Sequence, residues 1–216
     1  MIKKVIFNLK IQDIVVIGRR IRTLSFILIF FGISSISTAH PHVFINAFLS
    51  IDFNDSGVCG IGVRWDFDEM FTELMLEEYD ADANGIFDDN EKKRLYNEAF
   101  VNLKEFGFFT KIFVGNNRVE YSKTENFKAY IKDGQMIYEF YIPLSINISS
   151  DSYKLINICP YDETYYMDVY LDEEEPVTFL NNDKFDLNYS IEEDENMAYY
   201  FGQIYPQVIH LKAKKK

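Results

Sequence analysis

The sequence alternates from His42 to Phe53, with an apolar residue at every odd position and mostly polar residues, apart from Phe44 and Phe48, at the even ones. A period of two is typical of a β-strand with one buried face, so we expect the odd positions to face the core. Residues 54–57, Asn-Asp-Ser-Gly, read as a turn, and the same alternation resumes from Cys59 to Trp65. The two runs and their turn predict a β-hairpin.

The period then changes. Apolar residues recur every three or four positions from Phe67 to Tyr79 and again from Glu91 to Phe106, which predicts two amphipathic helices separated by residues 80–90. After Gly107 short β-type segments return, over Phe108–Val114, Phe127–Ile131, Gln135–Ile142, Tyr153–Ile158, Tyr165–Leu171 and Val177–Leu180. We therefore predict an α+β fold, an antiparallel β-sandwich-like domain over residues 40–191 with a helical insertion over 66–106. Residues 192–216 are predicted to be a charged C-terminal tail.

The first 39 residues have the order of a secretory signal peptide. Residues 1–22 carry six basic and one acidic side chain, Leu24–Ile33 is an apolar run, and Ser37-Thr38-Ala39 offers small residues for cleavage. An uncleaved membrane anchor is the alternative, but spanning a bilayer takes about 20 apolar residues. We expect cleavage after Ala39, a periplasmic location and no direct membrane insertion afterwards.

The charge of the chain narrows the choice of ligands. The sequence has 34 acidic and 22 basic side chains, a net charge of −12, and removing residues 1–39 leaves 177 residues with a net charge of −17. Nucleic acid is an improbable partner because phosphate binding needs clustered Lys and Arg, whereas cations suit such a domain. Cys59 and Cys159 are the two cysteines and either form a disulfide or remain two buried thiols.

Residues 80–91 match the calcium-loop pattern D-x-[DN]-x-[DN]-G-x₅-E without exception. This spacing brings hard oxygen ligands onto one ion, with Gly85 allowing the sharp bend. The expected ligands are the side chains of Asp80, Asp82 and Asn84, the carbonyl of Ile86, Asp88 directly or through water, and bidentate Glu91. The segment resembles an EF-hand over about residues 67–106. The alternative is an acidic loop in which Asp88 or Asp89 caps the second helix.

Cleavage after Ala39 makes His40 the first residue, in the order His40-Pro41-His42. The α-amine and imidazole of His40 and the imidazole of His42 give three nitrogen ligands for zinc, or for nickel or cobalt. Pro41 has no N–H, which excludes a square-planar copper site with a deprotonated second amide. Carboxylates that complete such a site are expected from Asp66, Asp68 or Asp162, whose ordinary roles would be helix capping and turn formation.

Four segments of the chain resemble an uncharacterised bacterial family. They are Ala39-His40-Pro41-His42-Val43-Phe44, Arg64-Trp65-Asp66-Phe67-Asp68-Glu69, the acidic loop, and Tyr161-Asp162 followed by Tyr165-Tyr166. That family is catalogued as the periplasmic component of an ABC-type transport system, and its members often accompany nickel/cobalt-efflux-type permeases. The resemblance implies a periplasmic transition-metal role, with zinc foremost and the His-Pro-His start as the site. Glu163 stands where the family pattern has Pro, which weakens the transfer to Asp162.

Taken together, these features predict a non-enzymatic accessory protein that captures or hands on a transition metal for a membrane permease or transporter, with a structural calcium site. Two alternatives remain open. A copper histidine-brace oxidative enzyme would need a second, distant histidine, and His210 is the one that the sequence offers. A calcium-stabilised interaction domain would bind no transition metal.

Overall fold

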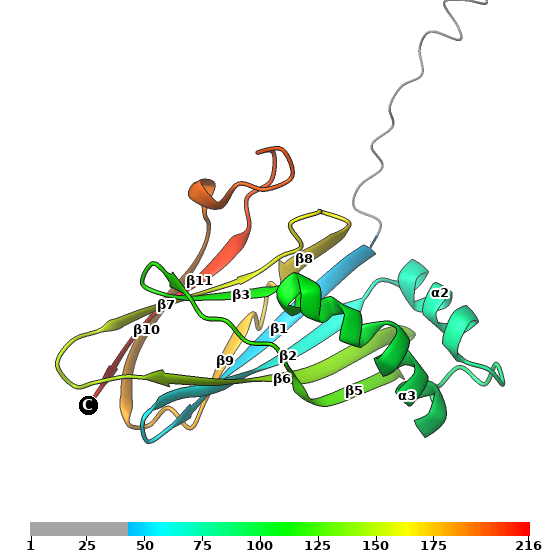
Figure 1. The fold of residues 1–216 in the computed structure, drawn as a ribbon, viewed down its shortest axis with the longest axis horizontal. Coiled ribbons are helices and arrows are strands. Elements are labelled where there is room, and N and C mark those ends of the chain that lie inside the picture. The colour runs from blue at the N-terminus through cyan, green and yellow to red at the C-terminus, as the bar shows by residue number, and fades with distance from the viewer. Residues whose placement is uncertain (1–42) are drawn as a thin grey trace, which may run out of the picture. The chain divides into compact units, whose positions relative to one another are not determined.

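The computed structural model describes residues 43–216, which form two β-sheets and two α-helices (Figure 1). The first sheet has the order β5-β6-β2-β1-β8, and β9 also pairs with β1. The second sheet has the order β10-β11-β7-β3-β4. The strands of the first sheet are β1 (Val43–Asn54), β2 (Gly57–Phe67), β5 (Glu125–Lys132), β6 (Gln135–Asn147), β8 (Met167–Leu171) and β9 (Val177–Leu180). Those of the second are β3 (Thr110–Val114), β4 (Asn117–Arg118), β7 (Lys154–Pro160), β10 (Phe185–Glu193) and β11 (Gln207–Lys215). This is a mixed α+β protein in which strands predominate.

The predicted hairpin at the start of the described chain is confirmed. β1 and β2 pair antiparallel, with Ile45 opposite Phe67 and Ile51 opposite Ile61. The odd positions of β1 are buried, as the alternation requires. β2 lies between β1 and β6, so its backbone groups are used on both sides.

One hydrophobic core joins the inward faces of the two sheets. It contains Ile61 and Trp65 from the first sheet and Ile112 and Ile158 from the second. Phe100 closes it from the helical side, with its ring centre 4.1 Å from that of Phe127. Burial of aromatic side chains of this size supplies much of the free energy that stabilises a domain.

Both predicted helices are present, with shorter bounds. α2 (Glu69–Tyr79) begins after its N-cap Asp68, because Phe67 is still part of β2. α3 (Asp89–Glu98) ends earlier than predicted and is followed by the 3₁₀ segment η1 (Phe100–Phe109). Gly107 and Phe108 have φ values of 60° and 43°, which no right-handed helix accommodates. The prediction of one helix as far as residue 106 was wrong, because the α-helix ends at Glu98 and the chain continues as a 3₁₀ segment.

The expectation of a purely antiparallel β-structure is also corrected. β8 and β9 pair with β1 in parallel, from Val43 opposite Met167 to Asp52 opposite Leu180. Parallel pairing needs a crossover instead of a hairpin, and the chain reaches β8 from β7, a strand of the second sheet. The first sheet is therefore mixed.

The predicted C-terminal tail over residues 192–216 was wrong. Residues 207–215 form β11, a strand between β10 and β7 in the middle of the second sheet. Val208, Ile209, Leu211 and Ala213 are fully buried, which overrides the high lysine content of this segment. Within residues 43–216, no helix is both long enough and apolar enough to cross a bilayer.

Candidate metal centres

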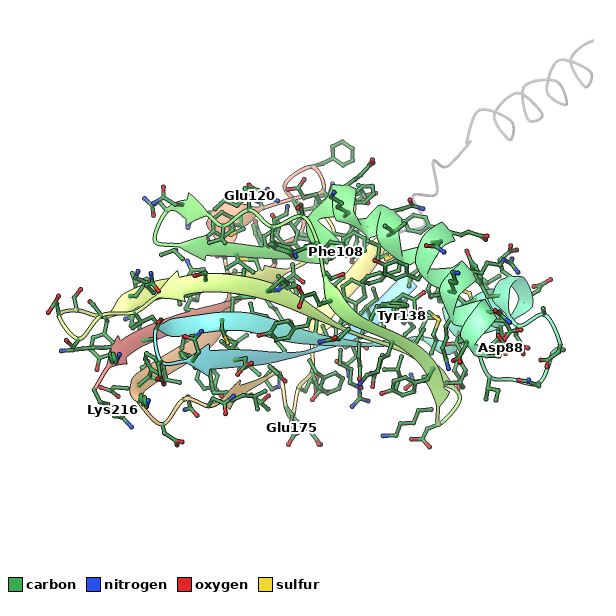
Figure 2. All side chains as sticks on the ribbon, turned by 60° about the horizontal axis from the view of Figure 1, so that its bottom comes forward. Asp88, Phe108, Glu120, Tyr138, Glu175 and Lys216 are labelled. Atoms are coloured by element: carbon green, nitrogen blue, oxygen red, sulfur yellow. The ribbon has the colours of Figure 1, made fainter. Side chains whose placement is uncertain are left out.

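The loop predicted to bind calcium connects α2 to α3 at one end of the described region, and Figure 2 shows Asp88 of this loop far from Lys216. The two helices are fastened together beside the loop. Arg94 of α3 donates a hydrogen bond of 2.7 Å to the carbonyl oxygen of Glu78, and its guanidinium lies 4.8 Å from the centre of the Tyr79 ring. Phe87, inside the loop, is buried in the core. The protein therefore fixes both ends of the loop.

The first half of the loop turns around the carboxylate of Asp80. Gly85 N–H donates to Asp80 Oδ2 at 2.7 Å, and Asn84 N–H donates to Asp80 Oδ1 at 3.2 Å. These bonds hold the pKa of Asp80 below its usual range, and the bond from Gly85 has the largest effect. Gly85 has a φ of 81°, in the left-handed region that favours glycine.

Glu91 reaches back from α3 to the beginning of the loop and is only 7% exposed. Its Oε1 accepts from Ala81 N–H at 2.7 Å and its Oε2 from Asp88 N–H at 2.8 Å. Carboxylate oxygens of Asp80, Asp82 and Glu91 all lie within 4.8 Å of one another. Two oxygens that each lie about 2.3 to 2.6 Å from one calcium ion are separated by at most about 5 Å. The three carboxylates therefore lie close enough together to contact one metal ion.

The other loop residues have protein partners of their own. Asn84 Oδ1 accepts from Ile86 N–H at 2.9 Å. Asp88 is the N-cap of α3, and its Oδ1 accepts from Asn90 N–H and Glu91 N–H at 2.7 and 2.9 Å. Asp88 thus has the capping role given above as the alternative, which leaves its second oxygen for an ion or for a bridging water.

The second predicted centre includes His40 and His42, which lie outside the described residues. Of its predicted carboxylates, Asp68 is hydrogen-bonded directly to the start of β1. Its Oδ2 accepts from Phe44 N–H and its Oδ1 from Phe71 N–H, both at 2.8 Å. Asp68 therefore caps α2 and fastens this helix to β1 at the same time.

Asp66 and Asp162 are also engaged by neighbouring residues. Asp66 pairs with Arg64, whose Nε lies 2.7 Å from Asp66 Oδ1. Asp162 is 3% exposed and accepts from the N–H and the hydroxyl of Thr164 and from the N–H of Met167. These bonds shape the turn between β7 and β8, the ordinary role that the sequence analysis assigned to Asp162.

A further carboxylate, which the sequence analysis missed, also lies beside the start of β1. Asp168 of β8 stands directly opposite Phe44 in the parallel pairing, and among residues 43–216 it has no hydrogen-bond partner. Burial raises its pKa. The pKa of the nearby Tyr170 is also raised. Burial is the main cause, and the negative charges of Asp168, Asp172, Asp68 and Asp66 contribute in that order. Four carboxylates therefore surround the start of β1. Their proximity depends on the parallel pairing of β8 with β1, for which the sequence carries no local signal.

His210 and the two cysteines lie elsewhere. His210 is in β11 of the second sheet, where its Nδ1 lies 3.0 Å from Asn157 Oδ1. Cys59 of β2 and Cys159 of β7 belong to different sheets, and both thiols are free. Burial raises the pKa of the Cys159 thiol to about 12. The described residues thus show two free thiols, of which Cys159 is buried and Cys59 is partly exposed, so neither the disulfide nor a pair of buried thiols is present.

These features define a mixed α+β protein with an acid-lined inter-helix loop and an acidic surface at the entry of its first strand. The chain belongs to the family described as "Protein of unknown function (DUF1007)", whose model matches residues 25–199. It is 29% identical over 132 residues to "Uncharacterized 15.5 kDa protein in trpE 3'region" of Spirochaeta aurantia. That alignment covers 61% of this chain and 93% of the relative.

Proposed function

We propose that this protein is an exported metal-binding accessory protein with a structural calcium site, and that it captures or hands on a transition metal for a membrane transporter. One observation carries the calcium part of the proposal, the convergence of carboxylate oxygens of Asp80, Asp82 and Glu91 within 4.8 Å on a loop held between two helices. In this proposal the two sheets form a sandwich and the helix-loop-helix is an EF-hand-like insertion.

In the proposed calcium site, Asp80, Asp82 and Asn84 bind through side-chain oxygens and Ile86 through its carbonyl. Glu91 supplies both carboxylate oxygens, and Asp88 binds through the oxygen that does not cap α3. A single extracellular loop of this kind binds calcium at about 10⁻⁴ to 10⁻³ M. Such an affinity suits a structural ion that is retained where calcium is abundant.

The proposed transition-metal site uses the amine and imidazole of His40 and the imidazole of His42. The proposal adds Asp168 to the carboxylates of Asp66, Asp68 and Asp162, because Asp168 stands opposite Phe44 and has no hydrogen-bond partner among residues 43–216. His42 is two residues from Phe44, so the two Cα atoms are at most about 7 Å apart, and Asp168 pairs with Phe44. Zinc, or nickel or cobalt, is the ion that such a mixed nitrogen and oxygen set takes.

The proposed setting is the periplasm, after cleavage behind Ala39, with a metal permease of the inner membrane as the partner. The acidic net charge supports a role with cations and argues against anionic partners.

The test is a calorimetric titration of zinc, nickel, copper and calcium into two proteins, one beginning at His40 and one with a single additional Ala in front. The extra residue removes the α-amine from His40 and leaves the loop of residues 80–91 unchanged. We expect transition-metal affinity to fall by at least about tenfold and calcium affinity to stay constant. Equal transition-metal affinity of the two proteins would refute the amine-and-imidazole site, and binding of calcium alone would leave the calcium-stabilised interaction domain.

A further inference from the structure

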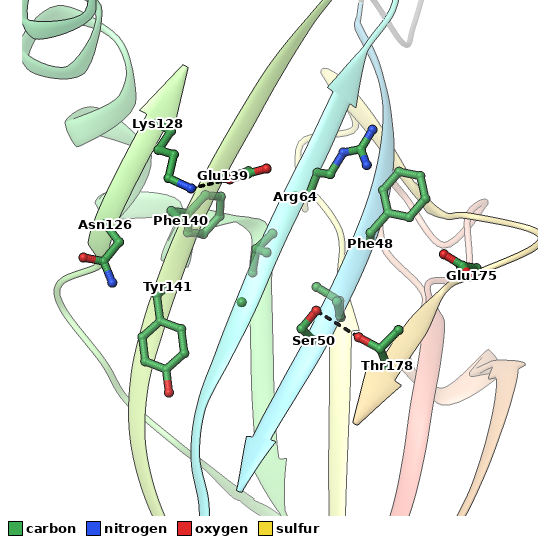
Figure 3. Close-up of a pocket in the computed structure, with 13 residues that line it drawn as sticks. Phe48, Ser50, Arg64, Asn126, Lys128, Glu139, Phe140, Tyr141, Glu175 and Thr178 are labelled. Atoms are coloured by element: carbon green, nitrogen blue, oxygen red, sulfur yellow. Dashed lines mark hydrogen bonds and ion pairs between the residues drawn. The ribbon is translucent and has the colours of Figure 1, made fainter. Parts of the chain in front are cut away.

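A groove of about 410 Å³ crosses the outer face of the first sheet, apart from the loop of residues 80–91 (Figure 3). Its volume falls within the range of about 300 to 1,000 Å³ typical of small-molecule sites. Two rows of cross-strand neighbours line it. One row runs from Thr178 through Ser50 and Gly62 to Tyr141, and the other runs from Phe48 through Arg64 and Glu139 to Lys128.

Gly62 of β2 forms the floor of the groove, and the neighbouring Gly60 lies under the ring of Tyr141. A Cβ atom at Gly60 would lie 2.1 Å from atoms of the Tyr141 ring, so this ring rests directly on the strand backbone. A Cβ atom at Gly62 would meet only Ser50, at 3.5 Å, so the space above Gly62 is open. Because Gly62 stands between Ser50 and Tyr141 in the register, the hollow lies in the middle of the sheet face.

Aromatic rings stand on both sides of this floor. Figure 3 shows Phe48 on β1 and Tyr141 on β6, with β2 between them. The guanidinium of Arg64 lies 4.8 Å from the centre of the Phe48 ring, and the Tyr141 hydroxyl lies 3.3 Å from Asp52 Oδ2. Both rings are therefore held in place before any ligand arrives.

Polar groups lie at the rim, some of them without a partner among the described residues. Asn126 sits at an irregularity in the pairing of β5 with β6 and has a φ of 57°, and bulges of this kind redirect a side chain. Within the described part of the chain, neither the side-chain amide of Asn126 nor the carboxylate of Glu175 has a hydrogen-bond partner. Ser50 and Thr178 contribute two hydroxyls that lie 2.9 Å apart.

The charges in the groove are already balanced. Arg64 is paired with Asp66, and Lys128 Nζ lies 2.9 Å from Glu139 Oε2. The remaining free charge is the carboxylate of Glu175, and the whole chain has a net charge of −12. This arrangement disfavours an anionic ligand. A peptide strand is also disfavoured, because the backbone groups of β2 are used by β1 and β6 and offer no free edge.

We propose that the groove binds a neutral oligosaccharide, with one sugar ring over Gly62 between Phe48 and Tyr141. The apolar C–H face of a pyranose packs against aromatic rings, and its neighbouring hydroxyls match the donors and acceptors of an amide, a carboxylate and paired hydroxyls. The glycine floor gives the flat ring its space.

The test uses neutral trisaccharides, namely cellotriose, maltotriose and triacetylchitotriose, with trigalacturonate and triglycine as anionic and peptide probes. Binding is measured by NMR titration of the isotopically labelled protein. The key variant is Gly62→Val, which fills the floor and suits a strand, since φ at Gly62 is ordinary and the added Cβ has room. The matched control is Ser190→Val, an exposed strand position of β10 in the other sheet.

We expect at least one neutral trisaccharide to bind the unmodified protein with a Kd of about 1 mM or tighter. Gly62→Val should weaken this binding by at least about tenfold, and Phe48→Leu should weaken it by removing the stacking ring, whereas Ser190→Val should leave it unchanged. The absence of binding by all three neutral sugars would overturn the proposal. Equal binding by Gly62→Val, or tighter binding of trigalacturonate or triglycine, would overturn it as well.

Discussion

Replacing Glu91 by Gln should remove the stabilisation of the protein by calcium without unfolding the calcium-free protein. Glutamine keeps the length of the side chain and an oxygen acceptor, and it is compatible with the capping box that Glu91 forms with Asp88. It loses the negative charge and the second carboxylate oxygen, which are what a calcium ion requires at the last position of the loop.

The expected magnitude follows from mass action. With a Kd of about 10⁻⁴ to 10⁻³ M, about 10 mM calcium is 10 to 100 times Kd, which stabilises the folded protein by about 1.4 to 2.7 kcal/mol. For a domain of this size about 1 kcal/mol corresponds to about 2 to 4 °C in Tm. The unmodified protein should therefore gain about 3 to 11 °C, and the Glu91→Gln variant close to nothing.

The assay is thermal unfolding followed by circular dichroism, in EDTA and in calcium chloride. Glu77→Gln is the matched control, because Glu77 is exposed on α2 outside the loop and undergoes the same chemical change. Magnesium should stabilise the protein less than calcium, since it demands a tighter octahedral geometry. If calcium leaves the Tm of the unmodified protein unchanged, or raises that of Glu91→Gln equally, the loop is not a calcium site.

Three further predictions concern the fold. Leu211→Ala should lower the free energy of unfolding in urea by about 2 to 5 kcal/mol. Lys212→Ala, on the exposed side of the same strand, should change it by less than about 0.5 kcal/mol. Similar losses for the two variants would contradict a buried β11. Thr72→Val should lower the free energy of unfolding by about 1 to 3 kcal/mol in the same assay, because the buried Met136 N–H donates to the Thr72 hydroxyl at 2.9 Å. Thr72→Ser keeps the hydroxyl and should retain most of this stability. Because the folded pKa of Cys159 is about 12, the unfolded thiol ionises first, so stability should fall as pH rises from about 8.5 to 12. The stability of Cys159→Ala should decline less over this interval, and parallel stability curves would count against the assignment.

Much of the fold could be predicted from local patterns. The alternation in β1 and β2 placed their faces correctly because a half-buried strand has a strict period of two. The helices α2 and α3 were found by their spacing, and their starts lie at Asp68 and Asp88, residues of the type that caps helices. These signals are local, so one sequence is enough to read them.

The errors arose where tertiary pairing decides the structure. β11 carries Val208, Leu211 and Ala213 among lysines, and its central position depends on β7 and β10, more than 10 residues away in sequence. The carboxylate of Asp168 comes to the start of β1 only through the parallel pairing of β8. The loop of residues 80–91 could be read because all its candidate ligands lie within twelve residues. Acidic groups that come together from separate strands could not be predicted from the sequence in this way.

α2 spans about 16 Å at 1.5 Å per residue, from its N-cap Asp68, one of the carboxylates proposed for the N-terminal site, to the loop of residues 80–91. Calcium could couple the two proposed metal centres only if it moved this helix. At its first turn, however, α2 is fastened to β1 through Asp68 and to β6 through Thr72, and Tyr79 is buried at its last turn. Sensor EF-hands work by opening a helix pair, for which these attachments leave no freedom. We therefore expect calcium to stiffen the loop locally and to leave the affinity of the N-terminal site for zinc unchanged, which titrations with and without calcium would measure.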